Sequence, residues 1–214
     1  DVIKSEYLKP CCLRSIHKKT EDITLLDIKQ AVQEDHFPYH SDEVCEKLQE
    51  KALYNFDLNM AFYEKLDRNK FNEEIELFLS NNPEFVEVKD LNDYAGVSGI
   101  YIMVLDEYKQ IYIGITNSKV GIKGRIQSHW NVTKTLDRLI FGGVDSSILS
   151  IDSFRHLDTT RIFVQTNINK EDLYIEEYNV IENAFSSEFI TNRTIGGELN
   201  SIEAIVSRKL RKLL

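Results

Sequence analysis

Cysteine is scarce in this sequence, and long apolar runs are missing. The chain has three cysteines in 214 residues, at positions 11, 12 and 45, and they form neither CxxC pairs nor a regular spacing. This favours reduced thiols inside a cell and argues against a zinc site. No apolar run approaches the roughly 18 residues that span a bilayer, and residues 1–10 lack the zones of a secretory signal. We therefore expect an intracellular protein, cytoplasmic or nucleoid-associated, with no membrane partner.

Positive charge is also in short supply, since the formal net charge is -9. That value by itself argues against a nucleic-acid partner, because a polyanion binds to locally positive surface. The acid is concentrated in residues 1–90, which hold 12 Lys and Arg against 20 Asp and Glu, whereas residues 91–214 hold 14 against 15. Two basic groups lie in the second part, around 119–138 and at 208–212. Each is either a surface that faces phosphate or an ordinary solvated face.

Residues 1–90 are expected to form a mainly helical, acidic region. Residues 23–34 and 41–56 place apolar side chains at three- and four-residue intervals, with Asp22 and Ser41 as N-caps. Residues 72–82 predict a shorter helix that ends near Asn81, after which Pro83 and Gly96 interrupt the helical period. We therefore divide the chain into 1–90, a helical region of unknown role, and 91–214, a second domain.

Residues 91–214 combine strand and helix signals. Residues 99–105 and 110–116 are rich in β-branched and aromatic residues and are joined by a hairpin loop, and 161–166 predicts a buried strand. Helices are expected at 121–131, from Asn169 as N-cap to about residue 185, and at 201–214, the last two separated by a glycine-containing loop. The fold class predicted is α/β (α+β), with a small three-stranded sheet flanked by helices and preceded by the helical region.

Two tyrosines stand beside glycines in the hairpin. If the loop leaves Leu105 opposite Gln110, Tyr101 lies opposite Gly114 and shares one face of the sheet with Tyr112. Strand tyrosines usually pack in the core. Glycine inside a strand is costly unless a backbone or a ligand comes close, so we expect Gly99 and Gly114 to leave room at this surface.

The helix at 121–131 adds Arg125 and His129, which are four residues apart and share one flank. An arginine can grip a phosphate with two hydrogen bonds, and a histidine can orient or deprotonate a nucleophile near neutral pH. The alternative is an ordinary pair of solvated side chains.

The helix that follows residue 169 contains a carboxylate on its predicted apolar face. That face is formed by Tyr174, Tyr178, Ile181 and Phe185, and Glu177 falls within it. A buried carboxylate requires a cation, a donor or a metal ion. A salt bridge to Arg125 and a role as a Mg²⁺ ligand are the two alternatives.

Taken together, these residues resemble the GIY-YIG nuclease family. Residues 99–101 and 112–114 match both name-giving tripeptides in the right order, with ten residues between them. Arg125 and His129 match the family's helical arginine and the His or Tyr one turn later. Glu177 matches its acidic helix motif, with Glu176 or Glu182 as alternatives, and Asn192 matches its late asparagine, with Asn200 as alternative. The resemblance spans about residues 94–200.

The resemblance implies a Mg²⁺- or Mn²⁺-dependent endonuclease that hydrolyses DNA phosphodiester bonds. Glu177 would hold the metal ion, and Arg125 would meet the charge that develops on the phosphate. Tyr101 would be the general base, assisted by His129, with Tyr112 positioning phosphate or water, although the choice between the two tyrosines stays open. We expect nearby cations to make the phenolate accessible. Asn192 would donate to phosphate or hold Glu177.

Two other interpretations remain open at this stage. One is a catalytically inactive GIY-YIG-like module that binds DNA or protein. The other gives residues 1–90 the function, for example as a dimerisation module. A restriction or mobile-element role fits a small intracellular chain with an appended segment.

Overall fold

The computed structural model describes residues 42–131 and 149–192, and within them the chain is a mixed α/β structure. The elements in chain order are α2 (Asp42–Lys65), α3 (Arg68–Asn81), β1 (Val86–Glu87), η3 (Leu91–Tyr94), β2 (Gly99–Leu105), β3 (Gln110–Thr116), α4 (Gly121–Asn131), η6 (Ile151–Ser153), η7 (His156–Asp158), β4 (Arg161–Gln165), α5 (Leu173–Asn183) and η8 (Ser187–Phe189). Several predicted features lie outside the described residues: the helices at 23–34 and 201–214, the N-caps Asp22 and Ser41, and the loop after Asn192.

The described part of the chain contains one antiparallel sheet with the strand order β1-β4-β2-β3. β2 pairs with β3 on one side and with β4 on the other, and β3 is an edge strand. The hairpin register is as predicted, with Leu105 opposite Gln110 and Tyr101 opposite Gly114. The strand expected at 161–166 is present as β4.

The prediction of three strands was wrong, because β1 adds a fourth among the described residues. Val86 pairs with Val164 and Glu87 with Phe163, and the backbone N–H of Val88 donates to the carbonyl of Ile162 at 2.9 Å. Two residues are too few to show an alternating pattern, and β1 follows a proline in a stretch that was assigned to a junction. Pairing with β4 creates this strand, and residues on both sides of position 90 therefore share one sheet.

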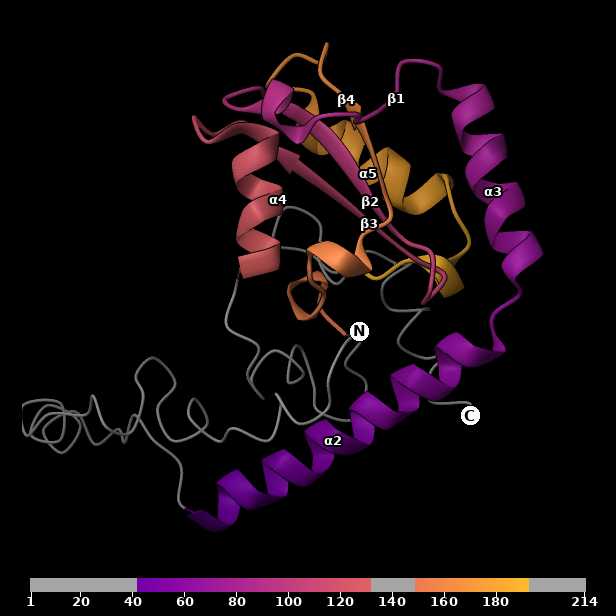
Figure 1. Ribbon diagram of the computed structural model, residues 1–214, viewed down its shortest axis with the longest axis vertical. Helices are drawn as coiled ribbons and strands as arrows, with labels where there is room; N and C mark the ends of the chain where they lie inside the picture. Colours follow the sequence, from indigo (N-terminus) through magenta and orange to yellow (C-terminus); the bar gives the residue numbers. More distant parts are fainter. Residues whose placement is uncertain (1–41, 132–148, 193–214) are drawn as a thin grey trace, which may run out of the picture.

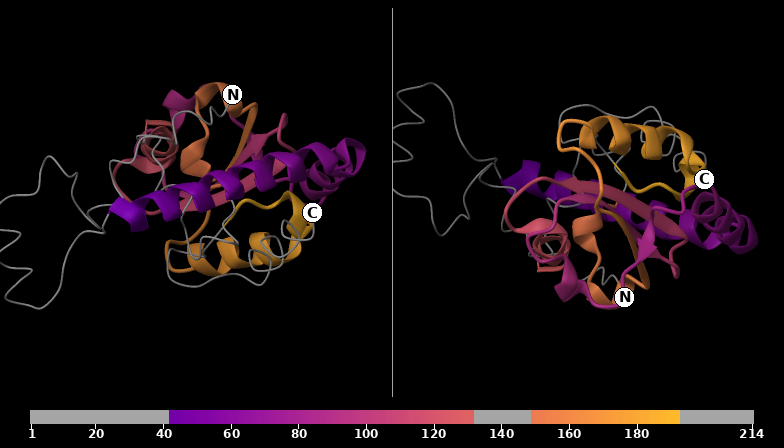
Figure 2. Two further views of the ribbon diagram at one scale, coloured as in Figure 1. Left: turned by 90° about the horizontal axis from the view of Figure 1, so that it is seen from below. Right: turned by 90° about the horizontal axis from the view of Figure 1, so that it is seen from above.

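The two faces of the sheet pack against different helices (Figures 1 and 2). Tyr101, Met103 and Leu105 face α4 and pack with its buried Ile122 and Ile126. The alternate residues of β2 point to the other face, where they form a core with α5 and α3. Side chains alternate along a strand, so α4 and α5 cover opposite faces, and Figure 2 shows this arrangement from two directions.

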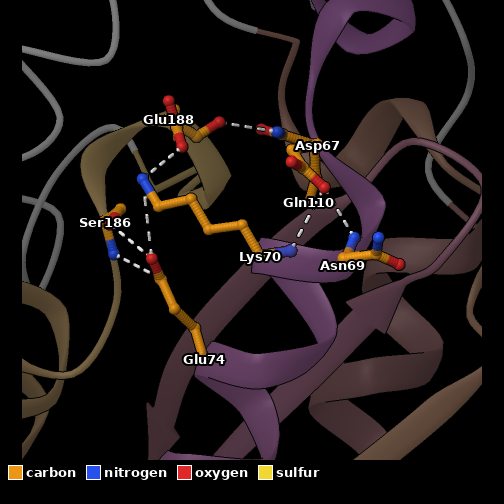
Figure 3. Close-up of polar contacts among 7 residues, drawn as sticks. All are labelled: Asp67, Asn69, Lys70, Glu74, Gln110, Ser186 and Glu188. Carbon is orange, nitrogen blue, oxygen red and sulfur yellow. Dashed lines mark hydrogen bonds and ion pairs between the residues drawn. The ribbon is translucent and has the colours of Figure 1, made fainter.

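The helices before residue 90 belong to the same packed structure. Phe71, Ile75 and Phe78 of α3 are buried in the core that contains β2 and α5. Polar contacts fasten α3 to the segment around η8 (Figure 3): Lys70 Nζ lies 2.7 Å from Glu188 Oε1, and the backbone N–H of Ser186 donates to Glu74. The region divided off at residue 90 therefore contributes to the core of the sheet.

None of the helices in ranges 42–131 and 149–192 has the length and apolar character needed to cross a membrane.

Helix α5 differs from the prediction in its start and in its buried face. It begins at Leu173, with Asp172 as the preceding cap residue, and the carbonyl of Asn169 accepts from the N–H of Asp172 in the turn before it. Asn169 is therefore not the N-cap. Tyr174 and Tyr178, which were expected in the apolar face, are 52% and 44% exposed.

The residues of α5 that pack against the sheet are Leu173, Glu177, Val180 and Ile181. Two apolar stripes on this helix are equally compatible with a period of 3.6 residues. Packing on the isoleucines of β2 and β3 selects the aliphatic stripe, and the tyrosines stay outside. Glu177 was expected to be buried, and it lies in the buried stripe.

Candidate active site

The hairpin brings Tyr101 across the backbone of Gly114. A Cβ atom at position 114 would lie 2.5 Å from both Cζ and Oη of Tyr101, so only glycine leaves room for the ring. Gly99 serves a different purpose, because a Cβ there would lie 2.3 Å from the carbonyl oxygen of Gln165 in the neighbouring segment. Gly114 thus makes room for a side chain of the site, whereas Gly99 makes room for backbone.

Helix α4 presents Arg125 and His129 in different environments. His129 is buried, with 4% of its surface exposed, and Arg125 is exposed. Ile122 and Ile126 are buried between the helix and the sheet, as their spacing predicted. Both side chains nevertheless reach the hydroxyl of Tyr101, as a shared flank predicted, with the imidazole inside and the guanidinium at the surface.

Three polar side chains form a hydrogen-bonded chain within the site. The Oη atom of Tyr101 lies 2.9 Å from Nε2 of His129, and Nδ1 of the same ring lies 2.6 Å from Oδ1 of Asp152. The Tyr112 ring makes an edge-to-face contact with His129, with the ring centroids 5.2 Å apart, and its centroid is 6.2 Å from that of Tyr101. Both motif tyrosines therefore adjoin the same histidine.

Sequence reasoning did not identify Asp152. It lies 23 residues after His129 in the short turn η6, with no motif around it. The side-chain oxygen of Ser150 accepts from the backbone N–H of Asp152, and a Ser-x-Asp turn of this kind is too common to indicate a site. Only the tertiary structure brings its carboxylate to the imidazole.

The two phenols are strongly biased toward their neutral forms. Burial raises the pKa of Tyr101 well above its ordinary value, and Tyr112 and Glu177 raise it further, while the charge and hydrogen bond of Arg125 oppose them. Burial likewise raises the pKa of Tyr112 to about 12, again against the charge of Arg125. The expectation that neighbouring cations make the phenolate accessible is thus wrong for Arg125, because burial outweighs its effect.

The same interactions act on Arg125 in the opposite sense. Burial alone would lower the pKa of its guanidinium, but Tyr101, Tyr112 and Asp152 outweigh that effect and raise it. Arg125 therefore stays charged at the surface, close to both phenols.

Glu177 comes to the site from the opposite layer of the fold. Its side chain is buried under α5, with 4% of its surface exposed, and its charge raises the pKa of both Tyr101 and Tyr112. β3, which carries Tyr112 and packs against α5, is an edge strand of the sheet. The carboxylate is therefore close enough to act on the phenols electrostatically, although its helix covers the other face.

Asn192 holds the edge strand. Its Oδ1 accepts from the backbone N–H of Ile113 at 2.9 Å, and its Nδ2 donates to the carbonyl of the same residue at 2.6 Å. The preceding Thr191 donates its backbone N–H to Ile111. Asn192 is thus brought to the middle residue of the second tripeptide, where it fixes the backbone between Tyr112 and Gly114.

The site contains one buried carboxylate, Glu177, that could bind a magnesium-type ion. Among the described residues no group of three or more His, Cys, Asp or Glu is arranged to hold a metal ion. Mg²⁺ commonly uses one or two carboxylates and completes its shell with water and substrate phosphate. Glu177, a buried carboxylate beside two phenols and an arginine, fits that mode of binding. A pocket of about 270 Å³ between α3 and α5 lies on the far side of α5 and is not part of this site.

No protein-family model matches the chain, and searches of curated proteins and of solved structures also found no match. The functional interpretation therefore rests on the order of the motif residues and on their contacts.

Proposed function

We propose that this protein is a metal-dependent DNA endonuclease of the GIY-YIG type, which hydrolyses phosphodiester bonds. The observation that carries the proposal is the buried hydrogen bond between Tyr101 and His129, because it joins two motif residues that can move the proton of an attacking water. Arg125 and Glu177 act on the same phenol. A restriction or mobile-element role inside the cell, in the cytoplasm or at the nucleoid, is the setting we propose.

The proton moves through a phenol that stays neutral. A phenolate is scarce at neutral pH when the pKa of Tyr101 lies well above 10. Tyr101 gives its hydroxyl proton to Nε2 of His129 while it takes one from the attacking water. The water oxygen forms the new bond to phosphorus, and the bond from phosphorus to the 3' oxygen breaks. The 3' oxygen takes a proton from solvent, and His129 holds the proton that came from Tyr101.

The other residues stabilise charge and position the reactants. Cleavage of a phosphodiester requires the barrier to fall by roughly 20 kcal/mol, so several groups must act together. Arg125 faces the charge that develops on the phosphate, a contact worth about 10² to 10³ in rate. Mg²⁺ or Mn²⁺ bound through Glu177 would supply Lewis-acid polarisation of the phosphate and stabilisation of the leaving oxygen. Asn192 holds the backbone of β3 in place, and Tyr112 positions the phosphate.

One observation favours a second candidate function. Tyr101 has no exposed surface, and a general base must contact the water that it deprotonates. A catalytically inactive module that binds DNA or protein would keep the same buried cluster for stability alone. Tyr112, which is partly exposed, is the alternative base if the nuclease proposal holds and Tyr101 does not take part.

A plasmid-nicking assay separates these functions. The full chain is incubated with supercoiled plasmid and Mg²⁺ or Mn²⁺, with and without EDTA, and DNA binding is measured in parallel. We expect nicking that EDTA abolishes. Tyr101→Phe removes one hydroxyl and should reduce the rate at least about 10²-fold, and Glu177→Gln should stop nicking while DNA binding persists.

Matched controls keep the comparison specific. Tyr174→Phe removes a hydroxyl from an exposed tyrosine of α5, and Glu176→Gln neutralises the neighbouring carboxylate, and both should nick at the wild-type rate. Nicking by Glu177→Gln at the wild-type rate would exclude it as the metal ligand, and an unchanged rate for Tyr101→Phe would exclude it as the base. A wild-type chain that binds DNA without nicking it is the inactive module.

A further inference from the structure

The hydrogen bond between His129 and Asp152 sets which nitrogen of the imidazole carries a proton. The two atoms, Nδ1 and Oδ1, are 2.6 Å apart, and the side chains are 5% and 18% exposed. An ionised carboxylate accepts hydrogen bonds and donates none, so Nδ1 must be the donor. In a neutral ring Nε2 then has a lone pair, and the hydroxyl of Tyr101 at 2.9 Å donates to it.

The opposite tautomer would reverse the contact with the tyrosine. If Nε2 carried the proton, it would donate to the phenol oxygen of Tyr101, and the phenol could not pass its own proton to the ring. A carboxylate at Nδ1 removes this alternative, and it also stabilises the imidazolium that forms when Nε2 accepts a proton.

We propose that Asp152 is a positioning residue of the active site, which fixes His129 in the tautomer that accepts the proton of Tyr101. Its place in the reaction rests on the proposed nuclease function, whereas its control of the tautomer does not. Asp152 acts through His129.

The turn that carries Asp152 is held from three sides. The side-chain oxygen of Ser150 accepts from the N–H of Asp152. The N–H of Leu149 donates to the buried Asn59 of α2 at 3.2 Å, and the hydroxyl of Thr191 donates to the carbonyl of Leu149 at 2.7 Å.

These contacts connect distant parts of the sequence. Asn59 belongs to α2, outside the range of the family resemblance, and Thr191 lies beside the strand β3 through its bond to Ile111. The helical region before residue 90 thus contributes directly to the position of Asp152, and η6 is held between α2 and the edge of the sheet.

The tautomer can be measured without reference to activity. Nitrogen-15 correlation spectra of the full chain, labelled at histidine, report which ring nitrogen is protonated, and His129→Gln identifies the signal. We expect the Nδ1-protonated form in the wild type. Asp152→Asn, which is nearly isosteric, should populate the Nε2-protonated form. Asp152→Glu keeps an ionised carboxylate, which only accepts, and should retain much of the wild-type form, so that it serves as a second variant.

Asp158→Asn is the matched control, because Asp158 is a buried carboxylate of the adjacent turn η7 that accepts from the backbone N–H of Arg155. It should leave the His129 signals unchanged. In the nicking assay we expect Asp152→Asn to lower kcat about 10²-fold or more with KM little changed. Wild-type tautomer populations in Asp152→Asn would overturn the proposal, as would a changed tautomer with wild-type kcat. If the wild type itself fails to nick, the nuclease function fails, and the spectra still decide whether Asp152 sets the tautomer.

Discussion

Replacing Gly114 by alanine tests whether glycine is needed at this position to leave space for the ring of Tyr101. The substitution adds one methyl group to the strand β3 and removes no polar contact. That methyl carbon would lie 2.5 Å from both Cζ and Oη of Tyr101, where ordinary contacts are 3.4–4 Å. The tyrosine ring must therefore retreat by about 1 Å or the strand must shift.

The magnitude follows from how tightly the ring is held. Tyr101 has no exposed surface, and its hydroxyl is bonded to His129. Overpacking of a core costs about 1–3 kcal/mol, a lost hydrogen bond adds about 1 kcal/mol, and alanine regains about 0.5–1 kcal/mol of strand stability relative to glycine. We expect a net loss of about 1–3 kcal/mol, which lowers Tm by roughly 3–10 °C in a chain of this size. Under the proposed nuclease function, displacing the Tyr101 hydroxyl by about 1 Å should reduce nicking about 10²-fold.

Thermal unfolding and plasmid nicking measure the two effects separately. Gly124→Ala is the control for a crowded methyl away from Tyr101, since its methyl would lie 2.8 Å from Cβ of the exposed Val120. Alanine favours the helix by about 1 kcal/mol, which opposes the strain there. This variant should melt within a few degrees of the wild type. A Gly114→Ala variant with the wild-type Tm and the wild-type rate would show that the ring is not held against position 114.

Two further predictions concern the phenols and the edge strand. Burial raises the pKa of Tyr112 to about 12, so the folded state keeps a proton that the unfolded state loses near pH 10. The free energy of unfolding should therefore fall as the pH rises from 10 to 12, and urea unfolding at several pH values measures this fall. Tyr112→Phe should make the free energy of unfolding depend less steeply on pH, and an equal dependence in both proteins would contradict the prediction. Asn192→Ala leaves the N–H and the carbonyl of Ile113 without their side-chain partner and should cost at least about 2 kcal/mol, because each buried unpaired group costs about 1–3 kcal/mol. A loss below about 0.5 kcal/mol in thermal unfolding would mean that solvent replaces the asparagine.

The strands and helices that sequence predicted best are those with a long and unambiguous pattern. The hairpin of β2 and β3 has seven residues in each strand, and α4 begins and ends where its spacing indicated. β1 is too short to show a pattern, and its partner β4 lies far along the chain. For α5 the period was right, and Ile181, Phe185 and Glu177 are buried as expected. Tyr174 and Tyr178 were placed wrongly, because packing against the isoleucines of the sheet leaves them outside.

The candidate site divides in the same way. Tyr101, Tyr112, Arg125, His129, Glu177 and Asn192 were identified by their order along the chain, and each is placed beside the hairpin or acts on its phenols. Their individual environments were not predictable: His129 is buried while Arg125 is exposed, and Asn192 binds backbone. Asp152 carried no signal at all.

By itself the sequence determined the pairing of Tyr101 with Gly114, the helix that follows the hairpin, and a carboxylate at position 177 that had to be buried. These features depend on residues near one another, where the periods of strands and helices fix the geometry. Tertiary structure alone decided the fourth strand, the exposure of Tyr174 and Tyr178 on α5, and the contact between Asp152 and His129. Those features depend on segments far apart in the chain. Burial between these segments raises the pKa of Tyr101 and Tyr112 and keeps them protonated, although the nearby Arg125 lowers their pKa.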